Sequence, residues 1–337
     1  MNQWTSDQAN AWYAKQPWLV GANFIPSNAI NQLEMWQADT FDLPTIKREL
    51  GWAAAIGMNT MRVYLHDLLW DANRDGFISR INPFLDVAAS LGIRPMFCIF
   101  DDCWNPDAAL GKQPEPKPGI HNSGWLQSPG LRIANDPAQW PRLERYVKEL
   151  LAHFANDERI LLWDLYNEPG NNGNGEKSLP LVRAVFEWAQ AVRPSQPLSV
   201  GVWFEDAALN EFQLAQSDVI TFHNYESANH LERQIAALKE LGRPLICTEW
   251  LRRCPGFAPD GTQRHTENSL VQTCLPVFKQ EHVGCINWGL VAGKTNTIYP
   301  WGKPGGPAEP PVWFHDLFRQ DGMPYDSAEI EVFKQLT

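Results

Sequence analysis

Short apolar runs alternate along the chain with longer stretches in which apolar residues recur at helical spacing. The runs are continuous rather than alternating, as expected for parallel strands that are buried on both faces. They predict strands at residues 19–25, 59–65, 94–100, 160–166, 198–203, 219–223, 244–248 and 284–288. The helical stretches are at residues 43–56, 83–91, 138–154, 179–192, 207–214, 230–241, 269–280 and 311–318. This order predicts an α/β protein, and its eight repeats favour a closed (β/α)8 TIM barrel over a doubly wound sheet.

The long irregular segments all follow predicted strands. They cover residues 105–135, 169–177, 251–263 and 295–311 and are rich in Gly, Pro, Asn and Ser. In a barrel, the strand-to-helix loops lie together on the face that carries the active site. No linker or repeat divides the 337 residues, so we expect one catalytic domain, residues 1–337, with long strand-to-helix loops.

The charge and the apolar content narrow the range of partners. The net charge of -11 argues against nucleic acid, because binding to phosphates needs basic patches. No run reaches the roughly 18 apolar residues of a membrane helix, and no secretory apolar segment follows Met1. We therefore expect a monomer that has a neutral substrate and no membrane partner. As written the sequence indicates a cytoplasmic protein, although a periplasmic or secreted enzyme trimmed of its leader would look the same.

The cysteines and histidines show no metal-binding spacing. Cys98, Cys247 and Cys285 fall in predicted strands and are interpreted as small core residues. A disulfide between loop residues such as Cys103 and Cys254 stays open, because spacing alone fixes no pairing. No metal or cofactor is expected.

One segment resembles the start of a calcium-binding loop. Residues 71–76 read D-x-N-x-D-G, but Asn82 stands where the bidentate Glu of such a loop belongs. We interpret this segment as a turn rich in Asp and Asn. His121 and His315 also lack metal-ligand spacing with any neighbour.

Two glutamates follow predicted strands at facing positions of the expected barrel. The fourth strand runs into LLWDLYNEPG, which places Asn167 and Glu168 at its C-terminal edge, and the seventh runs into PLICTEW with Glu249. Two facing carboxyl groups can act on one glycosidic bond. A separation of about 5–5.5 Å gives retention of configuration, and about 6.5–9.5 Å gives inversion. Either Glu alone has a simpler reading as a capping or ion-paired residue, but the matched pair favours catalysis.

Further motifs occur in order on other predicted strands. Arg62 lies in MNTMRVYL, His223 and Tyr225 lie in VITFHNY, and Trp288 lies in GCINWGL. With the two glutamates, this set resembles the clan A barrel glycoside hydrolases, which include cellulases, β-mannanases and β-mannosidases of family 5. The resemblance implies a retaining β-glycoside hydrolase for gluco- or manno-configured substrates. Glu168 would then be the general acid/base and Glu249 the nucleophile.

The resemblance also implies roles for the neighbouring side chains. Arg62 would hold the nucleophile and keep its pKa low, and Tyr225 would donate a hydrogen bond to it. Asn167 would bind the substrate 2-hydroxyl. His223 would orient the acid, bind sugar, or be a core histidine, and these readings stay open. Trp288 would lie under the bound sugar.

Tryptophan is unusually frequent, with 16 residues. Those at positions 70, 104, 203, 250, 288 and 301 lie at or beyond predicted strand ends, whereas those at 52, 140 and 188 lie in predicted helices and are expected in the core. Indole faces suit the C–H-rich faces of pyranose rings. We expect sugar platforms at Trp288 first, and then at Trp104 and Trp203.

Several alternatives remain at this stage. The long loops after the third and eighth strands differ from those of well-known endoglucanases and favour short oligosaccharides or chain ends, hence an exo-acting glycosidase or transglycosylase. A non-catalytic carbohydrate-binding barrel, an inverting enzyme and an unrelated metal-dependent hydrolase are less favoured. His66, Asp67, Asp101 and Asp102 also follow strands and would either reach sugar hydroxyls or cap loops.

Overall fold

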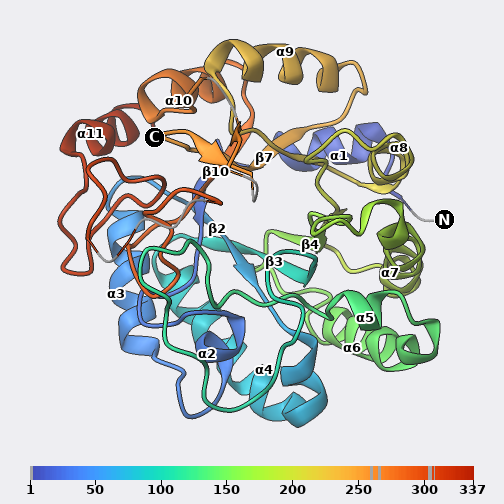
Figure 1. Cartoon of the computed structure of the whole chain (residues 1–337). Coiled ribbons are helices and arrows are strands. Elements are labelled where there is room, and N and C mark those ends of the chain that lie inside the picture. Colours follow the sequence, from blue (N-terminus) through green and yellow to red (C-terminus); the bar gives the residue numbers. More distant parts are fainter. Residues whose placement is uncertain (1–2, 259–260, 265–266, 303–305, 307) are drawn as a thin grey trace.

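The computed structural model is a nearly closed barrel of eight parallel strands with helices around it (Figure 1). It describes residues 3–258, 261–264, 267–302, 306 and 308–337. The barrel strands are β1 (Val20–Asn23), β2 (Thr60–Tyr64), β3 (Arg94–Asp101), β4 (Leu162–Asn167), β5 (Leu198–Ser199), β6 (Ile220–His223), β7 (Leu245–Glu249) and β10 (Gly284–Trp288). A small hairpin, β8 (Gly256–Phe257) with β9 (Gln263–Arg264), lies in the loop after β7, so β10 is the eighth barrel strand.

Parallel pairing follows the chain order around the barrel. The first strand pairs with both β2 and β10, and the ladder runs without a break from β5 to β6 by way of β1. A bridge between Val202 and Phe222 joins these two ends. There the amide of Val202 donates to the carbonyl of Thr221, and that of His223 donates to the carbonyl of Val202, both at 3.0 Å. The predicted (β/α)8 fold is confirmed.

The helices are α1 (Ser6–Tyr13), α2 (Gln32–Trp36), α3 (Leu43–Ala54), α4 (Asp67–Ser90), α5 (Leu131–Ala134), α6 (Trp140–His153), α7 (Leu179–Val192), α8 (Ala207–Gln216), α9 (Ala228–Lys239), α10 (Val271–Gln280) and α11 (Ser327–Leu336). Two short 3-10 helices, Pro137–Gln139 and Gly175–Ser178, precede α6 and α7. Helix α3 shows which local features of the sequence produce a helix. Asp42 caps it by accepting from the Thr45 amide at 3.1 Å, and Ile46, Leu50 and Ala53 form its buried stripe.

The observed helices differ from the predicted ones at both ends of the chain. Residues 311–318 form no helix and instead make an irregular segment, in which Phe318 bridges to Val291 and to Pro324. The last helix is α11, farther along the chain, and α1 was not predicted. Residues 71–76 lie at a break within α4, where Asn73 has non-helical backbone and its side-chain oxygen accepts from the Gly76 amide at 2.8 Å, which fits the predicted turn rich in Asp and Asn.

One apolar cluster closes the end of the barrel where the strands begin. It contains Tyr13 of α1 together with Leu19, Met96, Leu161, Leu162, Val219, Ile246 and Ile286. The Tyr13 hydroxyl donates to the His282 carbonyl at 3.2 Å, and Asn10 donates to the Gly242 carbonyl at 2.9 Å. The opposite face is therefore the one left for chemistry.

The long loops gather at that opposite face. In Figure 1 the loop after β3 and the orange-red segment after β10 lie on the same side of the barrel. Parts of the predicted loops after β7 and β10, including most of the Gly-Pro tract after Trp301, fall outside the described residues. Among the helices that the structure describes, none is long and apolar enough to cross a membrane.

All six cysteines are free thiols, so the disulfide left open between Cys103 and Cys254 does not form. Cys98, Cys247 and Cys285 are buried in barrel strands, as predicted.

Candidate active site

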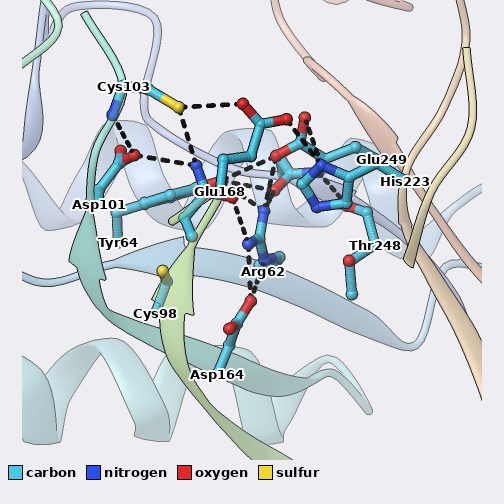
Figure 2. A network of polar contacts seen from close by, with 12 residues as sticks. Arg62, Tyr64, Cys98, Asp101, Cys103, Asp164, Glu168, His223, Thr248 and Glu249 are labelled. Carbon is cyan, nitrogen blue, oxygen red and sulfur yellow. Dashed lines mark hydrogen bonds and ion pairs between the residues drawn. The ribbon is translucent and has the colours of Figure 1, made fainter. Parts of the chain in front are cut away.

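The two predicted glutamates meet at the mouth of the barrel (Figure 2). Strand β7 ends at Glu249, and Glu168 follows directly after the last residue of β4. One carboxylate oxygen of each lies within 4.8 Å of the other. The backbone of Glu168 has a φ of 44°, a left-handed conformation that residues other than glycine seldom adopt. Such strained positions often occur at functional sites.

Glu249 is held by three donors. Oε1 accepts from the Arg62 guanidinium at 2.9 Å and from the Tyr64 hydroxyl at 3.3 Å. Oε2 accepts from the Tyr225 hydroxyl at 2.8 Å. The predicted contacts of Arg62 and Tyr225 with this carboxylate are both present, whereas Tyr64 was not predicted.

Arg62 is the centre of a network of polar contacts (Figure 2), and its side chain is buried, with only 1% exposed. Its guanidinium lies 2.6 Å from Asp164 of β4, donates to Asn167 at 2.7 Å and to Asn23 at 3.0 Å, and also contacts the Tyr64 hydroxyl. Two buried carboxylates, those of Asp164 and Glu249, thus share one cation. A full set of partners is what makes a charge at this depth tolerable.

Glu168 has a separate set of partners. Its Oε1 lies 2.8 Å from Nδ1 of His223, and its Oε2 accepts from the Asn171 amide at 2.6 Å. The Cys103 thiol contacts the same Oε2 at 3.2 Å. The motifs had pointed to His223 but to neither Cys103 nor Asn171.

Burial dominates the electrostatics of both glutamates. It raises the pKa of Glu168, and hydrogen bonds from Cys103 and Asn171 only partly offset it. Burial also raises the pKa of Glu249, and the charge of Glu168 adds to the rise, while Arg62 and Tyr225 oppose it. The expectation that Arg62 keeps the pKa of Glu249 low was therefore wrong in its net direction, because desolvation outweighs the ion pair.

His223 is neutral at physiological pH. Burial lowers the pKa of its imidazole to about 4, even though the charge of Glu249 favours protonation. Its Nδ1 also lies 3.5 Å from Glu249, so one ring nitrogen lies close to both carboxylates. Of the three readings left open, this contact favours orientation of the acid.

Asn167 is fixed from two sides. Its Oδ1 accepts from Arg62, and its Nδ2 donates to Asp101 at 2.9 Å. Asp101 also accepts from the Trp125 indole at 2.7 Å, and burial raises the pKa of this carboxyl to about 6. Asp101 thus helps to fix the side chain of Asn167.

The other acidic residues at strand ends form hydrogen bonds and ion pairs with neighbouring residues. Asp102 accepts from the Tyr166 hydroxyl at 2.6 Å and from the Gly170 amide at 2.9 Å. Asp67 accepts from the Ser128 hydroxyl at 2.7 Å and pairs with Arg142 at 2.6 Å, while His66 caps α4. These contacts fit the loop-capping alternative.

Some of the tryptophans lie near the two glutamates and others in the core. Trp288, 8% exposed, packs edge-to-face on Tyr64 and on Trp125, with ring centroids 5.9 Å and 5.6 Å apart, and Trp104 is partly buried against the same cluster. Trp203 is not part of this cluster, and its indole donates to the carbonyl of Pro169, the residue after Glu168, at 3.1 Å. The core contains the tryptophans at positions 70, 188 and 250, with those at 52 and 140 packed against it.

Trp125 was not predicted, because it lies within a long loop. Trp301 lies beside Tyr225, with ring centroids 4.7 Å apart.

The carboxylates of Glu168 and Glu249 and a ring nitrogen of His223 are close enough to hold a metal ion. The cation of Arg62 already lies 2.9 Å from Glu249, and the Tyr225 hydroxyl donates to the other oxygen of that carboxylate. A fixed positive charge repels a second cation, so these contacts suit proton transfer and nucleophilic attack better than metal binding.

Comparisons with known proteins find solved structures of similar fold and a matching family model. Among solved structures, a GH5_18 protein from Streptomyces cattleya in complex with Manb1-4GlcNAc has a TM-score of 0.61 at 14% identity, over 94% of this chain and 80% of that one. The endo-beta-1,4-mannanase of Thermotoga petrophila has a TM-score of 0.57 at 15% identity, over 94% and 76%. The exo-beta-1,4-mannosidase of Opitutaceae bacterium strain TAV5 has a TM-score of 0.64 at 16% identity, over 94% and 59%.

None of the curated proteins compared gives a match. At identities this low, the structural likenesses establish the fold alone. The family model described as Cellulase (glycosyl hydrolase family 5) matches residues 53–293, which is more than half of the chain and includes both glutamates. The chain therefore belongs to glycosyl hydrolase family 5 and is a glycoside hydrolase.

Proposed function

We propose that this glycoside hydrolase cleaves β-linked gluco- or manno-configured glycosides with retention of configuration. The observation that carries the proposal is the separation of the two carboxyl groups. Oxygens of Glu168 and Glu249 within 4.8 Å of each other leave no room for the water that an inverting enzyme places between sugar and base. A short separation is typical of double displacement.

In the first step, a carboxylate oxygen of Glu249 attacks the anomeric carbon, and the bond to the leaving oxygen breaks. Glu168 gives its proton to that oxygen, and a glycosyl ester forms on Glu249. In the second step, Glu168 takes a proton from water, whose oxygen attacks the anomeric carbon and releases Glu249. The raised pKa of Glu168 suits the acid, because more of it is protonated near neutral pH.

The other partners fit this sequence of steps. Arg62 and Tyr225 stabilise Glu249 as an anion before attack and as a leaving group afterwards. Asn167, fixed by Arg62 and Asp101, is the candidate for binding the 2-hydroxyl, and Trp288 is the candidate platform under the ring. The mannose-containing complex and the mannan-cleaving enzymes among the structural neighbours make β-mannosides the first substrates to test.

The test is a screen of 4-nitrophenyl β-mannoside, β-glucoside and related β-glycosides, with the isosteric Glu249→Gln variant as control. We expect release of nitrophenol from at least one β-glycoside and loss of that release in the variant. Proton NMR of the first sugar formed should show the β-anomer. An α-anomer as first product, or wild-type turnover by Glu249→Gln, would contradict the proposal.

A further inference from the structure

We propose that the enzyme removes single sugars from the non-reducing ends of its substrates, because the space beyond the first bound sugar is filled by its own loops. This inference rests on the proposed function, since it uses Glu168 as the acid and Glu249 as the nucleophile. It adds where along an oligosaccharide the enzyme acts.

The roles of the two carboxyl groups set the direction of the substrate. The anomeric carbon lies between them, and the leaving group lies on the side of Glu168, which protonates it. With its leaving group at Glu168, the sugar ring would lie over Trp288, beside Tyr64 and Trp125, whose rings pack on that indole. In a β-linked chain the next sugar toward the non-reducing end is attached to the far edge of this ring. A second sugar would therefore have to occupy the region behind Trp288.

That region is closed by what we call the loop wall, residues 117–126 of the loop after β3 and residues 294–299 of the loop after β10. The two segments are hydrogen-bonded to each other. The Asn122 amide donates to the Thr295 carbonyl at 2.8 Å, and the Asn296 side chain donates to the Lys117 carbonyl at 2.9 Å. Nδ1 of His121 lies 2.7 Å from the Tyr299 carbonyl.

The loop after β1 fastens the same wall from the other side. Asn31 donates to the Gly124 carbonyl and Gln32 to the Leu126 carbonyl, both at 2.9 Å. The Lys294 amide donates to the Ser27 carbonyl at 3.0 Å, and its ammonium pairs with Glu34 at 2.7 Å. Three loops are thus joined by backbone and side-chain bonds, which makes the wall a built part of the fold.

Little space remains under the wall. Tyr64, Trp125 and Trp288 pack edge-to-face on one another, with the Tyr64 and Trp125 centroids 5.0 Å apart. The cavity left between them and the wall measures about 20 Å³, and Asn122 and Thr297 also line it. This volume has room for about one water molecule and none for a hexose.

The experiment uses the full chain and tetrasaccharides labelled with a fluorophore at the reducing end. β-1,4-Mannotetraose and cellotetraose are the probes, with 4-nitrophenyl β-mannoside and β-glucoside run beside them. We expect early release of unlabelled monosaccharide together with labelled trisaccharide. The same tetrasaccharide capped by a 4-O-methyl group at its non-reducing end should not be cleaved. Glu249→Gln is the control that ties the products to this site.

The outcomes separate the two proposals. Nitrophenol release accompanied by labelled mono- or disaccharide as an early product would overturn the loop-wall inference and leave the proposed function standing. Cleavage of the capped tetrasaccharide at the wild-type rate would also overturn it. No hydrolysis of any aryl glycoside or tetrasaccharide would overturn the proposed function and this inference with it.

Discussion

Sγ of Cys103 lies 3.2 Å from Oε2 of Glu168, so a thiol is in contact with the candidate acid/base. Burial raises the pKa of Cys103, which keeps the thiol protonated and able to donate. This hydrogen bond lowers the pKa of Glu168, against the larger effect of burial. In Cys103→Ala the pKa of Glu168 should therefore rise. Because the acid acts in its protonated form, the alkaline limb of kcat/KM against pH should move to higher pH.

The matched control is Cys103→Ser, whose hydroxyl can donate to the same oxygen. Its alkaline limb should stay close to that of the wild type. An alkaline limb that moves to lower pH in Cys103→Ala, or moves equally in both variants, would show that the thiol does not tune the acid.

The hydroxyl of Tyr225 donates to Glu249 at 2.8 Å and lowers the pKa of that carboxyl. Its loss in Tyr225→Phe should raise the pKa of Glu249 and move the acidic limb of kcat/KM to higher pH, because the nucleophile acts as the anion. We expect kcat/KM at the optimum to fall by roughly 10²-fold, the typical effect of removing one aligned donor. Tyr13→Phe removes a hydroxyl contact at the opposite end of the barrel and should leave both values unchanged.

Arg62 and Asp164 form a buried ion pair at 2.6 Å. Removing one partner in Asp164→Ala should lower the free energy of unfolding by about 3–5 kcal/mol, because the remaining charge loses part of its compensation. The double variant Arg62→Met with Asp164→Leu should regain only part of this stability in urea unfolding, because Glu249 and Asn167 also lose the partner that Arg62 gave them. Activity should stay lost in the double variant, because Glu249 no longer has its cation. Recovery of activity would show that Arg62 serves only the fold.

Asp316 is a buried acid outside the catalytic pair. Burial raises its pKa to about 6, although it accepts from the Thr297 hydroxyl at 2.6 Å. The folded protein therefore holds this proton more tightly than the unfolded chain does, and the contribution of Asp316 to stability is lost as pH rises from about 4 to about 6.

Asp316→Asn keeps an acceptor for Thr297 and has no charge to bury. The stability of the variant relative to wild type should rise by up to about 3 kcal/mol across that interval, measured by urea unfolding at several pH values. A difference that does not change with pH would contradict this assignment. Asparagine also tolerates the left-handed φ of 54° at this position.

The strands could be predicted from the sequence because their two buried faces produce continuous apolar runs. Glu168 and Glu249 were predicted from their places at strand ends, and Arg62 from the resemblance to the barrel glycoside hydrolases. Asp164 carried an unused signal, since it is a charged residue inside the otherwise apolar run LLWDLY. Tyr64 carried another, since it lies two residues after Arg62 and therefore on the same face of β2.

Other features depended on tertiary contacts. Trp125 reaches the site only because its loop folds back over the barrel mouth, and no local pattern predicts such a return. Residues 311–318 are apolar enough to suggest a helix, but they pack as irregular chain beside the loop after β10. The first helix did have a local signal, because Thr5 and Gln8 form a capping box.

The left-handed backbone of Glu168 has a consequence for how catalysis is prepared. On ordinary extended backbone the side chain of Glu168 would point to the face opposite that of Asn167, whereas this turn sets the carboxyl group against His223 and Asn171 before any sugar arrives. The conformational cost falls on folding, once per molecule, and not on each catalytic cycle. The acid is thus preorganised by the main chain itself, and the stability of the surrounding barrel is what permits it.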